Sequence, residues 1–369
     1  MSKILYVGNF ELPDRNAAAH RVLGIAKSLR DAGNEVYFLN TLNDYNGEGV
    51  TKIYEGFIYY ECKRPSKSCI KELAKLIKIK IEEFSVNVLI AYNLNSWVGL
   101  NVYKYCKING VKMFGDITEW YSASGNLLRK ILIKIDTEIR MRYFNKKIDG
   151  LIVISRYLAN YYKDQNTITV PPTVDLKDPK WLTVLESKSK KVFVYSGQPG
   201  KKERLDLMVK AFADKRFEGK NIELHVIGTD EKKFRYIFNY DEPISERVKF
   251  LGRVPHNVAV DECKKAAWSV ILREKTRVVQ AGFPTKFVES VSCATPVLAN
   301  DFSNIREYAE KYNLGVIFEN QNALPEMLEY VIKIDDEQYA VYKENCKKCK
   351  AFDYRSWTIE LDAFINKSN

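Results

Sequence analysis

The stretch that decides the fold is residues 273–300, REKTRVVQAGFPTKFVESVSCATPVLAN. We expect a strand to end near Leu272, a loop to end in Gly282-Phe283-Pro284, a helix to begin near Thr285 with proline in its first turn, and TPVLAN to form the next strand. This order is typical of a parallel sheet whose strands are joined by crossover helices. Such sheets bind ligands outside the carboxyl ends of their strands.

The same alternation extends over the whole chain. KILYVG at 3–8 predicts a buried strand, residues 17–32 carry apolar side chains at helical spacing, and Gly33 closes that helix. Strand-like runs VNVLIAY, VKMFGDI and DGLIVIS follow, and KVFVYSG, IELHVIG and RVKFLG resume the pattern after residue 190. Between the halves, residues 171–191 have paired prolines and no clear period, as a connection would. The predicted fold class is therefore α/β, with two Rossmann-like halves.

Length and charge limit the classes of function. The chain has 369 residues, 46% of them hydrophobic, which fits two domains and excludes intrinsic disorder. Lysine and arginine outnumber acids 58 to 47, so the net charge of +11 indicates an anionic partner: nucleotide phosphate, lipid phosphate or nucleic acid. Nucleic acid is not expected, because no spacing typical of a nucleic-acid-binding motif occurs.

Cysteine usage and hydropathy predict a cytoplasmic protein without metal. No apolar run approaches the ~18 residues of a membrane span, and no secretory signal is visible. The seven cysteines are scattered and odd in number, which favours free thiols. Cys346 and Cys349 form a C-x-x-C without a second pair or a suitably spaced histidine, so we expect no metal site.

Basic residues gather in two helical segments of the first half, 63–84 and 127–147. Both mix lysine and arginine with large apolar residues at helical spacing. Either the apolar face packs on the sheet while the lysines face water, or at least one helix lies on an anionic bilayer surface.

The predicted helix start at Pro284 is the first candidate site. Free backbone N–H groups and the positive end of the helix dipole attract an anion, and Thr285 and Lys286 add a hydroxyl and an ammonium. Glu289, one turn further on, presents two oxygens suited to a vicinal diol such as a ribose. These features indicate a phosphate-plus-sugar site; the alternative is an ordinary helix started by proline.

Two further loops follow predicted strands. Gly197-Gln198-Pro199-Gly200-Lys201-Lys202 combines glycines, which permit close approach of a ligand, with lysines that neutralise phosphate, although it lacks the Walker spacing. The loop at 8–19 contains no G-x-G-x-x-G, so a dinucleotide fingerprint is absent.

Taken in order, DGLIVISRYLANYY, VPPTVD, YSGQPGKKERLDLMVKAF, IELHVIG, VKFLGRVP and GFPTKFVESVSCATPVLA resemble the family 4 retaining glycosyltransferases of GT-B fold, of bacterial surface polysaccharide type. The resemblance covers nearly the whole chain and is strongest from 192 to 299. It implies two Rossmann-like domains that face each other across a cleft. It also implies a domain layout: residues 1–172 for the acceptor, a linker at 173–190, residues 191–350 for the nucleotide-sugar donor, and a helix at 351–369 that crosses back to the first domain.

The resemblance also implies roles for individual residues. Glu289 matches the glutamate that binds the donor ribose, and Lys202 best matches the diphosphate lysine, with Lys201 and Arg204 as the alternative matches in the same loop. Gly197 matches the second-domain loop, and Arg253 and Val254 match the loop that contacts the base. The loop and helix start beside the diphosphate and sugar are matched by Gly282, Phe283, Pro284, Thr285 and Lys286. Asn16 and Ala17, followed by His20, match the first-strand loop.

The sequence departs from the family pattern in four places, one of which is Ala294, where a glycine usually precedes T-P-V. Ala281 stands where the family has an acid eight positions before the ribose glutamate, which leaves the donor sugar open. Gln198 replaces an arginine, and Arg273 is expected to supply the missing charge. Asp116 and Glu119 occupy the loop of an absent histidine, where one of them orients the acceptor hydroxyl or simply caps a helix.

His20 can likewise be structural or catalytic. The expected catalytic set is therefore Asp116, Glu119, Lys202 and Arg273.

The resemblance predicts transfer of a sugar from a nucleoside-diphosphate sugar, UDP slightly preferred over GDP, to a hydroxyl acceptor, without cofactor or metal. The basic first half points to a lipid-linked glycan as acceptor and to a peripheral location at the inner face of the plasma membrane. Two alternatives remain at this stage: a nucleotide-sugar epimerase of the same architecture, and a non-catalytic partner subunit, which the missing glutamate and histidine motivate.

Overall fold

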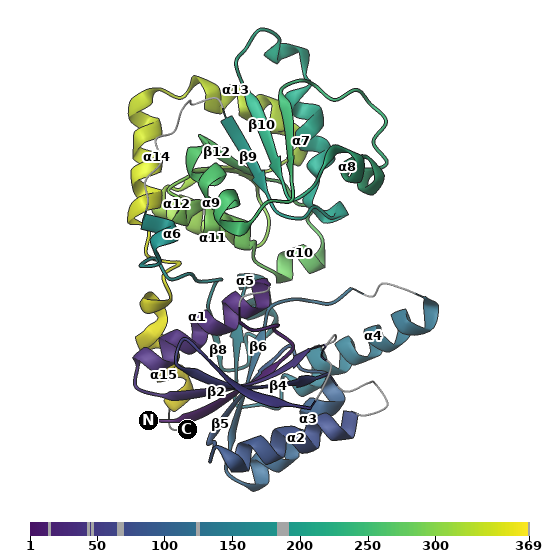
Figure 1. Cartoon of the computed structure of the whole chain (residues 1–369), viewed down its shortest axis with the longest axis vertical. Coiled ribbons are helices and arrows are strands. Elements are labelled where there is room, and N and C mark those ends of the chain that lie inside the picture. Colours follow the sequence, from purple (N-terminus) through teal and green to yellow (C-terminus); the bar gives the residue numbers. More distant parts are fainter. Residues whose placement is uncertain are drawn as a thin grey trace. The chain divides into compact units, whose positions relative to one another are not determined.

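The computed structural model describes residues 1–13, 16–42, 45, 48–64, 70–122, 126–182 and 192–367. The chain folds into two compact units. Unit 1 comprises Met1–Asp175, Ala281–Phe283 and Asp353–Asn369, and unit 2 comprises Leu176–Gln280 and Pro284–Phe352. Each unit has its own sheet and its own core, and each is described separately (Figure 1).

Unit 1 is built on a sheet whose described strands follow the order β3-β4-β2-β1-β5-β6-β7-β8. All neighbours pair in parallel except β3 and β4, which form an antiparallel pair at one edge. The strands are β1 (Lys3–Gly8), β2 (Glu35–Leu42), β3 (Val50–Tyr54), β4 (Phe57–Lys63), β5 (Val88–Tyr92), β6 (Lys112–Ile117), β7 (Gly150–Val153) and β8 (Thr167–Thr169).

The helices of unit 1 connect these strands as crossovers. They are α1 (Ala17–Asp31), α2 (Ile70–Glu83), α3 (Ser96–Ile108), α4 (Leu127–Ile139), which continues as a π-helical turn (Arg140–Phe144), and α5 (Arg156–Tyr161). The chain returns to this unit at its end. Tyr354–Trp357 forms a 3₁₀ turn before α15 (Thr358–Asn366), and the Ser28 hydroxyl on α1 donates to the Tyr354 carbonyl at 2.6 Å.

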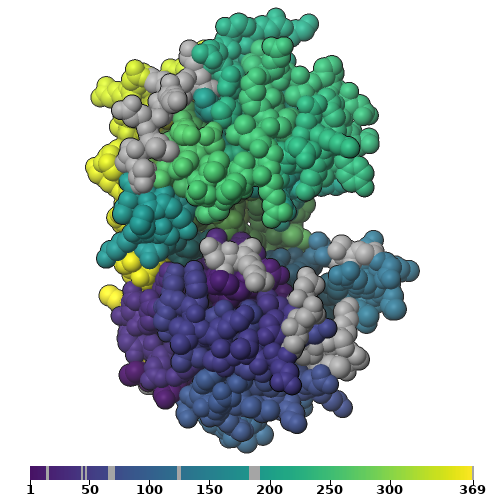
Figure 2. Space-filling model, in the orientation of Figure 1, coloured from purple at the N-terminus to yellow at the C-terminus, as the bar shows by residue number. Residues whose placement is uncertain are grey.

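Buried apolar side chains of α1 and the central strands form the core of unit 1, and α15 contributes Leu361 and Ile365. The first turns of α4 take no part in this core. The helix extends away from the sheet (Figure 1), and its atoms stand out from the surface of the unit (Figure 2).

Unit 2 has a fully parallel sheet of order β11-β10-β9-β12-β13-β14. Its strands are β9 (Val192–Ser196), β10 (Glu223–Ile227), β11 (Val248–Gly252), β12 (Trp268–Ile271), β13 (Val297–Asn300) and β14 (Gly315–Phe318). The helices are α6 (Pro179–Leu182), α7 (Leu205–Phe212), α8 (Glu231–Phe238), α9 (His256–Lys265), α10 (Arg277–Ala281), α11 (Thr285–Ser292), α12 (Ile305–Tyr312), α13 (Leu324–Lys333) and α14 (Asp336–Lys348).

Two parallel sheets with crossover helices confirm the predicted fold class of two Rossmann-like α/β halves. The helix predicted to begin near Thr285 is α11, and β13 follows it as expected. One local prediction was wrong: the segment before Gly282 is not entirely loop, because residues 277–281 form the short helix α10. The expected irregular connection at 173–190 also contains a helical turn, α6, and its residues 183–190 lie outside the described residues.

Candidate functional site

The candidate site of unit 2 lies at the carboxyl ends of β9, β10 and β12, where parallel sheets bind ligands. Gly197 follows β9 and Gly228 follows β10, both with positive φ (133° and 102°). A Cβ added to Gly228 would lie 2.4 Å from the carbonyl oxygen of Gly197, so only glycine permits this approach of the two loops. The close packing fixes the floor of the site.

Lys286, in the first turn of α11, supplies the most perturbed cation of the site. Its Nζ donates a hydrogen bond to the Tyr195 hydroxyl at 2.7 Å and lies 4.0 Å from the centre of that ring. Burial, with Arg273 and Lys202 adding to it against the opposing charge of Glu203, lowers the pKa of Lys286 to about 7. The ammonium therefore lacks a carboxylate partner strong enough to offset its desolvation.

Arg273 follows β12 and is held on both sides. Its backbone N–H donates to Asn300 Oδ1 at 2.8 Å, and Asn300 Nδ2 returns a bond to its carbonyl at 2.9 Å. The guanidinium forms an ion pair with Glu203 at 3.2 Å, while its buried Nε has no hydrogen-bond partner. Burial lowers the pKa of Arg273 even though Glu203 opposes the shift.

Charge in this cluster is unbalanced. Arg273 and Lys202 both act on Lys286, and of the two opposing carboxylates, Glu203 and Glu289, Glu203 has the larger effect. Glu203 is already paired with Arg273, and one of its oxygens accepts from the backbone N–H of Gly200 at 2.9 Å. No side chain caps the N-terminus of α11, so its first N–H groups add further positive potential. A group with two or more negative charges, such as a diphosphate, would balance this arrangement.

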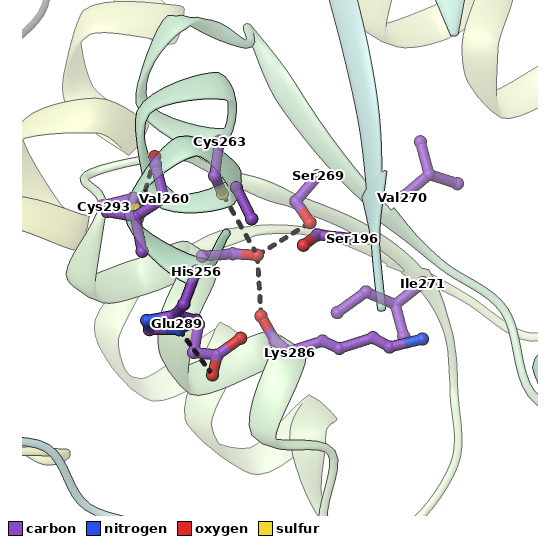
Figure 3. Close-up of a pocket in the computed structure, with 12 residues that line it drawn as sticks. Ser196, His256, Val260, Cys263, Ser269, Val270, Ile271, Lys286, Glu289 and Cys293 are labelled. Carbon is purple, nitrogen blue, oxygen red and sulfur yellow. Dashed lines mark hydrogen bonds and ion pairs between the residues drawn. The ribbon is translucent and has the colours of Figure 1, made fainter. Parts of the chain in front are cut away.

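Glu289 lies on the other side of the same helix turn. Its carboxylate is 3.8 Å from Nε2 of His256, the first residue of α9, and both line a small pocket with Ser196, Cys263 and Lys286. Figure 3 shows the Lys286 side chain extending away from the Glu289 carboxylate. The Ser290 hydroxyl, 2.7 Å from both the Lys286 carbonyl and the Ser269 hydroxyl, fixes α11 to β12 between them. The site is thus elongated, with a carboxylate end and a cationic end.

The structure gives less support to the other predicted donor residues. Arg204 forms an ion pair with Asp206 at 2.9 Å, so its charge is already neutralised. Lys201 and Arg253 are exposed and Val254 is half-buried, on the loops after β9 and β11. Gly282 and Phe283 belong to unit 1 by their contacts, although they directly precede Pro284 and α11 in the chain.

Asp116 does not fit its predicted role toward an acceptor. The side chain at the end of β6 is fully buried, and its oxygens accept from Arg21 Nη2 at 2.7 Å, Arg21 Nε at 2.9 Å and the Tyr6 hydroxyl at 2.5 Å. Burial and the Asp116 charge raise the pKa of Tyr6, so this hydroxyl stays protonated as donor. We therefore correct the prediction: Asp116 is a structural counter-ion, and half-buried Glu119 is the remaining carboxylate of that loop.

The predicted first-strand loop residues begin α1. Asn16 is its N-cap, with Oδ1 accepting from the backbone N–H groups of Ala18 and Ala19 at 2.9 and 3.0 Å, and Ala17 is the first helical residue. His20 is half-buried in the first turn. Capping occupies the Asn16 oxygen, which leaves its amide nitrogen for any ligand.

Three residues of the unit-2 site were not predicted. Tyr195 binds Lys286, Glu203 pairs with Arg273, and His256 faces Glu289. Tyr195 lies within a strand of apolar residues, where a tyrosine is ordinary core. Glu203 directly follows Lys202 in a loop that the sequence had indicated as a donor site, so its position next to Lys202 could have identified it.

The comparison with protein families gives a match that includes this site. Residues 179–349 match the family model for Glycosyl transferases group 1. The glycosyltransferase match spans most of unit 2 and includes the cationic cluster together with Glu289 and His256. The comparison with curated proteins gives no match.

Solved structures match the glycosyltransferase fold over the whole chain. Sucrose-phosphate synthase from Thermosynechococcus elongatus has a TM-score of 0.73 at 13% identity, with 98% of this chain and 97% of that chain covered. A glycosyltransferase from Rickettsia africae ESF-5 has a TM-score of 0.71 at 13% identity, with 100% and 99% covered. The catalytic domain of starch synthase IV from Arabidopsis thaliana, bound to ADP and acarbose, has a TM-score of 0.69 at 9% identity, with 99% of each chain covered. At these identities the likeness shows the two-domain GT-B fold.

Two features are absent from the described residues. In the ranges that the structure describes, no three His, Cys, Asp or Glu side chains gather in a way that could hold a metal ion. In the same ranges, none of the helices combines the length and the apolar character needed to cross a membrane.

Proposed function

We propose that this chain is a retaining glycosyltransferase that moves a sugar from a nucleoside-diphosphate sugar to a hydroxyl group of an acceptor. The main support is the excess of positive charge at the carboxyl ends of β9 and β12, where the partly buried cations Arg273 and Lys286 lie with the exposed Lys202 beside them. The group 1 glycosyltransferase match to residues 179–349 and the fold of the sucrose-phosphate synthase structure add to it.

The geometry suggests how a donor would lie. Its diphosphate would occupy the cationic end, and its ribose diol would bind the Glu289 carboxylate beside His256. During transfer the bond from the anomeric carbon to the diphosphate oxygen breaks and the acceptor oxygen bonds to that carbon. The acceptor proton passes to a donor phosphate oxygen on the same face, which gives retention. The cations stabilise the charge that develops on the leaving diphosphate.

Substitution of the two ends of the site tests the assignment. Glu289→Ala and Lys286→Met should each lower transfer from a nucleotide-sugar panel at least 100-fold, by the size of effects seen when a charged contact to the reacting group is removed. Lys232→Met on the exposed face of α8 is the matched control and should retain wild-type transfer. Full activity of Glu289→Ala would refute the site, and isomerised donor without acceptor would indicate an epimerase.

We further propose that UDP is preferred over GDP as the donor nucleotide and that the acceptor is a lipid-linked glycan at a membrane surface. Helix α4 supports the membrane part. Leu128, Ile131, Leu132 and Ile135 follow helical spacing and are 67, 46, 47 and 47% exposed, although such a stripe is normally buried. Exposed Arg129, Lys130 and Lys134 interleave with it, which matches an anionic lipid surface in both polarity and charge.

Vesicle sedimentation tests the membrane role. The protein should bind vesicles of phosphatidylcholine mixed with phosphatidylglycerol at low salt and release at high salt. The double variant Leu128→Ser, Leu132→Ser should lose binding without a change in Tm. Ile359→Ser, which alters a still more exposed apolar residue on α15, should not. Equal binding by the α4 variant would refute this role for the helix.

A further inference from the structure

Unit 1 contains a buried cation whose environment is incomplete. Arg140 directly follows α4, at the start of the π-helical turn, and its side chain is 1% exposed. Nη1 donates to the Asn93 carbonyl at 3.1 Å, and the guanidinium lies 4.5 Å from the centre of the Tyr121 ring. Nε and Nη2 are buried without a hydrogen-bond partner.

Arg21, in the same unit, shows what a structural buried arginine looks like. It is 3% exposed, its Nε and Nη2 bind the Asp116 carboxylate, and its Nη1 donates to the carbonyl of Val170 at 2.9 Å. Among the described residues, Arg140 has no carboxylate within ion-pair distance. A buried charge without a counter-ion costs several kcal/mol, so an arginine retained in this state suggests that an anion completes it.

A pocket lies beside this arginine. Its volume is about 110 Å³, enough for several water molecules and hence for a phosphate group. Gly8, Thr41 and Tyr92 place it at the carboxyl ends of β1, β2 and β5, where a ligand of this sheet is expected. Asn93 and Tyr121, the two residues that contact the Arg140 guanidinium, are both part of its lining.

The pocket offers two further polar groups of complementary character. Arg64, exposed at the end of β4, brings a second guanidinium to the lining. Asn9 brings a side-chain oxygen that is buried and unpartnered. Two guanidinium groups favour a phosphate over a single carboxylate as the ligand. The Asn9 oxygen needs a hydrogen-bond donor, such as a sugar hydroxyl.

We propose that this pocket binds a phosphorylated sugar, with Arg64 and Arg140 bound to its phosphate and Asn9 to one of its hydroxyls. The assignment of this sugar phosphate as acceptor rests on the proposed glycosyl transfer, whereas the phosphate site itself does not. Tyr121 both contacts the Arg140 guanidinium and lines the pocket, and it is 39% exposed, so its ring has room to turn aside when the phosphate binds. The phosphate belongs to a soluble sugar phosphate or to a lipid-linked one carried at α4.

Inorganic phosphate is the first probe, added against chloride at matched ionic strength while Tm is followed. Phosphate should raise the Tm of the wild type and of Lys286→Met, whose donor site is impaired. In the Lys286→Met background, Arg140→Met should raise the Tm without ligand, because an uncompensated buried charge is removed, and should abolish the response to phosphate. Arg64→Gln should bind phosphate at least 10-fold more weakly, the loss of one charge-assisted contact.

Three results would overturn the proposal. One is an equal phosphate response of Lys286→Met with and without Arg140→Met, and another is a lower ligand-free Tm caused by Arg140→Met, which would make Arg140 structural. If that variant does not fold, Arg64→Gln decides, since unchanged phosphate affinity would also refute the site.

Transfer assays then identify the acceptor. A soluble sugar phosphate, the same sugar without phosphate, and vesicles with a polyisoprenyl-phosphate-linked sugar are compared. Arg64→Gln should raise KM for the phosphorylated acceptor at least 10-fold without changing the donor affinity. Preference for the unphosphorylated sugar would refute the acceptor assignment. Phosphate binding that depends on Arg140 in a protein that binds no nucleotide would remove the proposed function and leave this site standing.

Discussion

Binding of a nucleoside diphosphate should be coupled to protonation of Lys286. Its ammonium is desolvated against Tyr195 and lies among other cations, so its pKa is lowered to about 7 from the usual value of about 10.4. A diphosphate placed among Lys202, Arg273 and Lys286 adds nearby negative charge, which favours the protonated form and raises this pKa again. The complex should therefore take up a proton at any pH between these two values.

The size of the effect follows from the fraction of protonated Lys286 in the free protein. With a pKa of about 7, that fraction is about one half at pH 7, about one tenth at pH 8 and about one hundredth at pH 9. If only the protonated form binds tightly, the apparent Kd rises as the inverse of this fraction, about 50-fold from pH 7 to pH 9. At pH 8 binding should consume roughly 0.9 proton per site.

Calorimetry with UDP, GDP and ADP at pH 8, in two buffers of different ionisation enthalpy, measures this uptake directly. Lys286→Met should bind more weakly and lose both the proton uptake and the pH dependence. Lys232→Met should behave as the wild type, because Lys232 is exposed on α8. A wild-type affinity that is equal at pH 7 and pH 9, with no proton taken up, would refute the electrostatic reasoning.

Two further predictions concern stability. Gly228→Ala, at φ 102° and with its Cβ directed at the Gly197 carbonyl, should lower the free energy of unfolding by at least about 2 kcal/mol, measured in urea. Gly219 also has a positive φ but open space around it, so Gly219→Ala measures the cost of the backbone strain alone. Equal losses of stability in the two variants would refute the clash. Asp116→Asn should lower the free energy of unfolding by about 3–5 kcal/mol, because it leaves Arg21 without a counter-ion. Glu119→Gln should leave stability unchanged but lower sugar transfer. An Asp116→Asn protein that is stable but inactive would instead make Asp116 catalytic.

The features that were predictable from the sequence are those with a local signal. The parallel sheets follow from short apolar runs separated by helical periods, and the proline before Thr285 sets the start of α11. The helix expected at 17–32 is α1, which ends at Asp31 before Gly33. Helix α10 was missed because five residues are too few to show a period.

The partners of the site residues were not predictable, because they are distant in sequence. Asp116 and Arg21 are 95 positions apart, and Lys286 and Tyr195 are 91 apart. A carboxylate in a loop after a strand has the same local sequence whether it faces solvent or a buried arginine. Only the register of the strands brings the Asp116 side chain under α1, where burial with Arg21 decides its role.

The total positive charge of the chain says less about function than whether each buried cation has a counter-ion. Arg21 has a carboxylate and a carbonyl for its guanidinium, and its ion pair serves the fold. Arg140, Arg273 and Lys286 are also costly to bury, and each keeps an unpartnered nitrogen or a lowered pKa, Arg273 despite its ion pair with Glu203. Arg273 and Lys286 lie at strand carboxyl ends in unit 2, and Arg140 lies behind the corresponding pocket in unit 1. Since desolvated charges without partners destabilise a protein, their retention in both units is best explained by anions that bind there during function.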